Sequence, residues 1–176
     1  MSATTLTAQA VAVLGALGLG SILGQYIGAS KDRRASRADV LSALANTEAD
    51  RWVGPDKPSW GEFQTSMRKF QTAALIARLP REAVWEYGVL AQAARWCSQE
   101  SWEQTGDPDT GGGVDVHLSS ATREAARTIA VIAWSWGPTH TWRWRRAKKR
   151  INEHLTKLQG PETRNALQRS RDHGFM

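Results

Sequence analysis

SWGEFQTSMRKFQTAA, residues 59–74, is the stretch that decides the fold class of this chain. A Ser followed three residues later by a Glu, here Ser59 and Glu62, is the capping-box pattern at the start of a helix. Apolar residues then recur at spacings of three and four, which predicts one buried helical face: Trp60, Phe63, Met67, Phe70 and Ala74.

Similar spacing recurs on both sides of this stretch. Helices are expected over about 36–52, 80–103, 119–136 and 139–158, with a short last helix from Pro161 to about 169. Breaks separate them at residues 54–58, at 105–117 and at two Gly-Pro pairs, Gly137-Pro138 and Gly160-Pro161. No stretch combines strict alternation with enrichment in β-branched residues, so no strand is predicted. The prediction is therefore an all-α fold. It comprises a single transmembrane helix and a cytoplasmic bundle of four to five helices.

Length and composition bound the class of protein. The chain has 176 residues, a net charge of +6, 41% hydrophobic residues and a single cysteine. A disordered chain and a disulfide scaffold are both excluded by these values. We expect an N-terminal segment over 1–30, a basic juxtamembrane helix and linker over 31–58, one helical bundle over 59–171 and a disordered tail over 172–176.

The first thirty residues carry no charged side chain, because the first is Lys31. Residues 8–29 are mostly apolar, and as a helix they would extend about 33 Å, enough to cross a hydrocarbon core of about 30 Å. A cleaved signal peptide normally begins with basic residues, which residues 1–9 lack. We therefore expect an uncleaved membrane span, with a signal peptide and a glycine-rich soluble helix as the alternatives.

Four cations follow the span and predict its orientation: Lys31, Arg33, Arg34 and Arg37. Basic residues beside a membrane helix favour the cytoplasmic side. The expected location is the cell membrane, with the N-terminus outside and residues 31–176 in the cytoplasm.

Small residues recur every four positions along the expected span: Ala8, Ala12, Ala16, Gly20, Gly24 and Gly28. Such a glycine-zipper stripe lets two helix backbones approach closely in lipid. It predicts a homo-oligomer formed through the membrane helix, although an alanine-rich chain also produces such stripes by chance.

The charge is concentrated in the last third of the chain, where residues 118–176 contain twelve basic and four acidic residues. Its densest run has six cations within eight residues and two interleaved tryptophans: Trp142, Arg143, Trp144, Arg145, Arg146, Lys148, Lys149 and Arg150. On a helix, Arg143, Ala147 and Arg150 share one face, and Arg145, Arg146 and Lys149 lie around the other side.

This run predicts an anionic partner, and three interpretations compete. Anionic headgroups attract cations near a membrane surface, where Trp is also favoured. A nucleic acid would pair its phosphates with the cations and stack bases on Trp. The third interpretation is a solvated face with both tryptophans turned into the bundle. We expect a membrane-anchored interaction protein that presents this helix to lipid or a protein partner, with a nucleic-acid-binding protein as the alternative.

No catalytic constellation, metal site or cofactor is predicted. The loop after residue 105 partly matches a calcium-binding loop at Asp107, Asp109, Gly112 and Asp115, but Leu118 stands where a glutamate is required. The four histidines are far apart in sequence. Cys97 lies on an expected helix, where a small buried side chain is the better interpretation. An enzyme of unidentified class would need a cleft around Glu100, Glu103 and His117.

The central part of the chain resembles known sequences. PREAVWEY at 80–87, LAQAA at 90–94 and SQESWE at 98–103 are similar to a stretch of small, uncharacterised actinobacterial helical proteins, a family of unknown function. The resemblance covers about residues 60–136. It implies an N-terminal membrane helix, which many of those proteins have, and it implies no activity and no functional residues.

Overall fold

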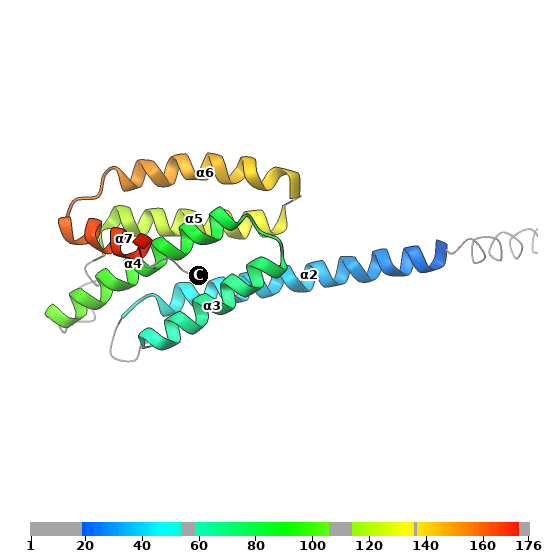
Figure 1. Cartoon of the computed structure of the whole chain (residues 1–176), viewed down its shortest axis with the longest axis horizontal. Coiled ribbons are helices and arrows are strands. Elements are labelled where there is room, and N and C mark those ends of the chain that lie inside the picture. The colour runs from blue at the N-terminus through cyan, green and yellow to red at the C-terminus, as the bar shows by residue number, and fades with distance from the viewer. Residues whose placement is uncertain (1–18, 54–58, 106–113, 136, 173–176) are drawn as a thin grey trace, which may run out of the picture. The chain divides into compact units, whose positions relative to one another are not determined.

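The computed structural model describes residues 19–53, 59–105, 114–135 and 137–172, and within them the secondary structure is helical, as predicted (Figure 1). The described residues form six α-helices and one short 3-10 helix. Their bounds are α2 Leu19–Asp50, α3 Trp60–Ile76, α4 Arg81–Thr105, α5 Val116–Trp134, η2 Gly137–Thr139, α6 His140–Leu155 and α7 Pro161–Asp172.

The chain divides into two compact units, residues 1–36 and 37–176. In the first unit, the described residues 19–36 form the N-terminal part of α2. No helix in the described part of the chain combines the length and the apolar character that a membrane span requires. The expected span over 8–29 falls partly outside the described residues, because these begin at Leu19.

The second unit has one hydrophobic core, to which α2–α7 all contribute. The part of α2 in this unit supplies Val40 and Leu44, so the core extends into the segment expected to be a juxtamembrane helix. The largest buried side chains of the other helices include Phe63, Met67, Phe70, Tyr87, Leu90, Leu118, Ile129, Ile132, Trp144 and Ile151. Four of the five residues predicted to form the apolar face of α3 are fully buried. The fifth, Trp60, is half-buried and packs against Trp96 with ring centroids 4.6 Å apart.

The start of α3 has the predicted capping box. The Glu62 amide donates to the Ser59 hydroxyl at 3.3 Å, and the Ser59 amide donates to the Glu62 carboxylate at 2.7 Å. Two amides that a helix start leaves without intrahelical partners are satisfied in this way. The hydrogen bond from the Ser59 amide also lowers the pKa of Glu62.

The turn from α3 to α4 has an arginine in the left-handed region, since Arg78 has a φ of 56°. The Leu79 amide donates to the Ala74 carbonyl and the Arg78 amide to the Leu75 carbonyl, both at 3.0 Å. These two bonds form a Schellman motif, in which the left-handed residue is usually glycine. The buried side chain of Leu79 then directs the chain back toward the core.

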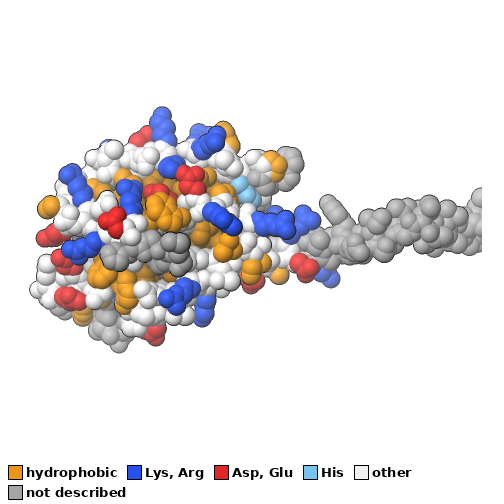
Figure 2. Space-filling model, viewed as in Figure 1, with side chains coloured by type: hydrophobic (Ala, Val, Ile, Leu, Met, Phe, Trp, Pro, Cys, Tyr) orange, Lys and Arg blue, Asp and Glu red, His pale blue; other side chains and the backbone are white. Residues whose placement is uncertain are grey.

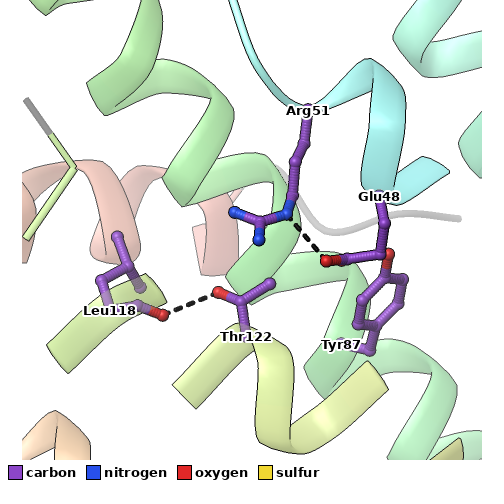
Figure 3. Close-up of polar contacts among 5 residues, drawn as sticks. All are labelled: Glu48, Arg51, Tyr87, Leu118 and Thr122. Carbon is purple, nitrogen blue, oxygen red and sulfur yellow. Dashed lines mark hydrogen bonds and ion pairs between the residues drawn. The ribbon is translucent and has the colours of Figure 1, made fainter. Parts of the chain in front are cut away.

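A polar cluster joins the end of α2 to α4 (Figure 3). The Arg51 Nε donates to Glu48 Oε2 at 3.0 Å, and the Tyr87 hydroxyl donates to Glu48 Oε1 at 2.9 Å. Arg51 is only 2% exposed, whereas Glu48 is 25% exposed. Burial, together with the neighbouring carboxylate, raises the pKa of Tyr87 well above 10.

A second arginine, Arg95 of α4, caps the C-terminal end of α2. Its Nη1 donates to the backbone carbonyls of Asp50 at 3.0 Å and Trp52 at 2.7 Å. Carbonyls at a helix end lack intrahelical partners, so these bonds satisfy two part-buried acceptors at and just beyond the end of α2. Arg95 and the Glu48 cluster therefore fix where α2 ends in this unit.

Helix α5 packs on α4, and each of the last two helices packs on one of these two. Helices α5 and α6 run antiparallel, side by side, and are joined through η2, while α7 packs on α4 (Figure 1). Short connections produce such antiparallel neighbours. Helix α7 begins at Pro161, whose missing amide costs nothing at a first helical position. The second unit is thus a helical bundle in which α6 has one face on α5 and another toward solvent.

Candidate functional site

The basic run predicted to bind an anion forms most of α6. The side chains of Arg143, Arg145, Arg146, Lys149 and Arg150 are exposed, and Lys148 is half-buried. On the face of the bundle seen in Figure 2, basic side chains lie among acidic and hydrophobic ones. The buried face of α6 is formed by Trp144, Ala147 and Ile151.

Two of the six cations are neutralised by carboxylates on other helices. Lys148 pairs with Glu82 of α4, and Arg150 pairs with Glu124 of α5. The hydrogen bond between Lys148 and Glu82 lowers the pKa of Glu82 and raises that of Lys148. Within the part of the chain that the structure describes, the other four cations form no ion pair: Arg143, Arg145, Arg146 and Lys149.

The two interleaved tryptophans lie in different environments. Trp144 is 1% exposed and belongs to the core, whereas Trp142 is 61% exposed. The interpretation in which both tryptophans turn into the bundle therefore applies to Trp144 alone. The Arg146 guanidinium lies 5.8 Å from the centroid of the Trp142 ring, within the range of a cation–π contact.

A groove of about 520 Å³ lies between α6 and α5. The α6 wall consists of Trp142, Arg143, Arg146 and Arg150. Helical spacing alone predicts Arg146 on the side of Arg145 and Lys149, but in the structure Arg146 shares the groove with Arg143 and Arg150. The spacing 143, 146, 150 follows one helical face and explains this placement.

The opposite wall is a part of the site that the sequence analysis missed. It consists of Glu124, Arg127, Thr128 and Val131 of α5. These residues also recur at spacings of three and four, and Val131 is 44% exposed on a helix whose other apolar residues are mostly buried. The sequence does contain a signal for this wall, because α5 has a second helical face that carries charged and apolar residues.

The residues predicted to set the membrane orientation lie on α2. Lys31, Arg33 and Arg34 are exposed, and the Arg37 guanidinium lies 6.0 Å from the centroid of the Trp134 ring. In the predicted packing stripe, Ala8, Ala12 and Ala16 lie outside the described residues, and Gly20, Gly24 and Gly28 belong to α2.

Asp115, the one described aspartate of the calcium-loop match, acts as the N-cap of α5. One carboxylate oxygen accepts from the amides of His117 at 2.7 Å and Leu118 at 3.4 Å, and the other accepts from the Gln159 amide at 2.9 Å. Burial acts to raise the pKa of Asp115, but these three amides together lower it. The rest of the match lies outside the described residues.

The remaining candidates for chemistry are dispersed. Burial raises the pKa of Cys97 to about 11, so its thiol stays protonated at neutral pH. Glu103 accepts a hydrogen bond from Gln99, and Glu100 is exposed. The rings of His117 and His154 lie 6.4 Å apart. No group of three or more metal-ligating side chains occurs among the described residues.

Comparisons with protein families, curated proteins and solved structures give no match to this chain.

Proposed function

We propose that this chain is a membrane-anchored interaction protein whose helix α6 faces anionic lipid. The observation that carries this proposal is Trp142, a large aromatic side chain that is 61% exposed among cations without ion-pair partners. Exposed Trp beside Arg and Lys is the combination found at membrane–water interfaces. Each cation near an anionic leaflet contributes about 1 kcal/mol of attraction.

The charge-free N-terminal segment supports the same proposal. A span over 8–29 would hold the bundle at the cytoplasmic leaflet, and tethering raises the effective concentration of α6 at the lipid surface. Weak attraction from each cation is then sufficient for α6 to stay on the membrane. The small-residue stripe would let two such spans associate.

The anchor and its orientation are tested by cell fractionation. The full chain with a C-terminal tag should remain in bacterial membranes after washes with high salt and with alkaline carbonate. The tag should be protected from protease in spheroplasts and cleaved in inverted vesicles. Release into the soluble fraction, or a shortened secreted product, would overturn the anchor.

The lipid contact of α6 is tested in the full chain reconstituted in nanodiscs. In a Cys97→Ser background, Lys149→Cys carries an environment-sensitive fluorophore on α6, and Asn165→Cys carries it on exposed α7 as a matched control. Discs containing phosphatidylglycerol should shift the emission at position 149 to the blue relative to phosphatidylcholine discs. Position 165 should change little.

Two results would contradict the lipid contact. An equal response at positions 149 and 165, or a response at neither, would leave α6 as a solvated face. A response at position 149 to single-stranded DNA added to phosphatidylcholine discs, with none to phosphatidylglycerol, would favour the nucleic-acid interpretation.

A further inference from the structure

Arg127 of α5 and Arg146 of α6 line the same groove from opposite walls. The ion pair between Arg150 and Glu124, in which Arg150 Nε donates to Glu124 Oε1 at 2.8 Å, marks the register of the two antiparallel helices. About one helical turn from this pair, residues 127 and 146 lie across from each other. The same register puts Val131 and Trp142, which also line the groove, one further turn along.

This arrangement places like charges together. Among the described residues that line the groove, four are arginines and one is a carboxylate, Glu124, which already pairs with Arg150. Arg127, Arg143 and Arg146 therefore share the groove without an acidic partner. Juxtaposed like charges are unfavourable, and an anion bound between them would remove the repulsion.

We propose that the groove between α5 and α6 is a discrete site for a phosphate monoester, and that its ligand is the headgroup of an anionic lipid such as phosphatidic acid. The inference rests on the proposed function in its choice of a lipid as the ligand. It goes further than that function, which needs only a general attraction of α6 to an anionic surface, because it assigns one phosphate group to the groove between α5 and α6.

The charge and the geometry of the groove select a monoester over a diester. A monoester phosphate carries between one and two negative charges near neutral pH and has three terminal acceptor oxygens. Three unpaired guanidiniums can bind those oxygens with paired N–H donors. A diester phosphate has one charge and two terminal oxygens, so it would compensate only one of the three arginine charges, whereas a monoester can compensate up to two.

The size and the apolar end of the groove suit a lipid headgroup. A volume of about 520 Å³ lies within the range of small-molecule sites. Val131 and Trp142, both exposed, form the end remote from the Arg150–Glu124 pair. They offer apolar contact to the glycerol and the first methylenes of the acyl chains while the phosphate lies among the arginines.

The test is calorimetric titration of the full chain in neutral detergent with short-chain, water-soluble lipids. Dihexanoyl phosphatidic acid should bind saturably, one per chain, and at least tenfold more tightly than dihexanoyl phosphatidylglycerol. Arg127→Gln and Arg146→Gln should each weaken binding of the phosphatidic acid about tenfold or more. Arg123→Gln removes the same charge from an exposed position of α5 outside the groove, and should change the affinity less than twofold.

Several outcomes would overturn the site. The site is overturned if the two lipids bind with equal affinity or if binding does not saturate. It is also overturned if the Arg127 and Arg123 variants, shown to be folded by circular dichroism, lose equal affinity for dihexanoyl phosphatidic acid. Inorganic phosphate that binds as tightly as dihexanoyl phosphatidic acid, with the same loss on Arg127→Gln, would preserve the phosphate site and overturn the lipid as its source. Adhesion of α6 to bilayers is measured separately in nanodiscs, so the groove can fail while that adhesion holds.

Discussion

Trp142 and Trp144 are separated by one residue on α6 and differ completely in environment, the first 61% exposed and the second 1% exposed. A separation of two residues turns a side chain by about 200° around an α-helix. One tryptophan therefore anchors α6 in the core, and the other is free to contact a partner. The structural role and the proposed binding role therefore fall on two different residues of the same type.

Replacing each tryptophan by alanine separates these roles. Trp144→Ala should lower the free energy of unfolding by about 3–5 kcal/mol, because it leaves a cavity in the core. Trp142→Ala should change it by less than about 0.5 kcal/mol, as expected of an exposed side chain. Chemical denaturation of the full chain followed by circular dichroism measures both values, and similar losses in the two variants would contradict the division of roles.

The part-buried Arg51–Glu48 pair should matter more for stability than the exposed Lys148–Glu82 pair. Glu48→Ala leaves Arg51 buried without its carboxylate and Tyr87 without its acceptor. This change should lower the free energy of unfolding by about 2–3 kcal/mol. The loss is smaller than for a fully buried pair because Glu48 is partly exposed. Glu82→Ala should cost less than about 1 kcal/mol. Equal losses in parallel denaturation experiments would show that burial of Arg51 does not govern the effect.

Arg78 offers a site for stabilisation. Its φ of 56° strains a non-glycine backbone. Arg78→Gly should relieve this strain, although glycine also raises the entropy of the unfolded chain. The free energy of unfolding should therefore rise by a net amount of about 0.5 kcal/mol. Arg81→Gly, in the first turn of α4, should instead destabilise by about 0.5–1 kcal/mol. A rise in melting temperature for the first variant and a fall for the second would verify the Schellman turn.

Asp115 should make stability depend on pH in the acid range. Its folded-state pKa lies below the ordinary value of 3.8, so at acid pH the unfolded chain binds more protons. The stabilisation from this carboxylate is fully present above about pH 5 and is lost as the pH falls through the lowered folded-state pKa.

Asp115→Asn keeps an N-cap side chain but removes the titration. The difference in unfolding free energy between the wild type and this variant should therefore shrink when the pH is lowered from about 6 to about 3. Denaturant titrations at a series of pH values measure it, and a difference that stays constant would show that Asp115 does not carry the effect.

Glu124 should limit how strongly the groove attracts anions. Glu124→Gln removes the carboxylate that neutralises Arg150, and the affinity for dihexanoyl phosphatidic acid should rise several-fold. Glu153→Gln makes the same change in net charge at an exposed position of α6 outside the groove, and should have a much smaller effect. Equal increases in the two variants would indicate a response to net charge alone.

The secondary structure was predictable because local chemistry sets it. The Ser59–Glu62 capping box and the apolar spacing that follows it determine where α3 begins and which face it buries. Pro161 similarly marks the start of α7. These signals act within one or two helical turns, so they are readable without knowledge of the fold. The prediction placed the C-terminal end of α6 near 158, whereas it ends at Leu155, since frayed ends depend on weaker signals.

The candidate site was predictable only in part. The density of cations on α6 was plain in the sequence, and so was the helical face shared by Arg143 and Arg150. The residues that face these cations could not be predicted, because Glu82, Glu124 and Arg127 belong to helices distant in sequence. Which cations are neutralised depends on the carboxylates that packing brings within reach.

The sequence by itself therefore determined an all-α chain and a strongly basic helix near its C-terminus, because helix formation and charge density are properties of neighbouring residues. The tertiary structure alone decided that Trp142 and Trp144 have different environments, that Arg127 joins Arg143 and Arg146 in one groove, and that Arg51 is buried. Each of these depends on how helices distant in sequence pack, since burial and pairing arise only when their side chains meet in the folded core.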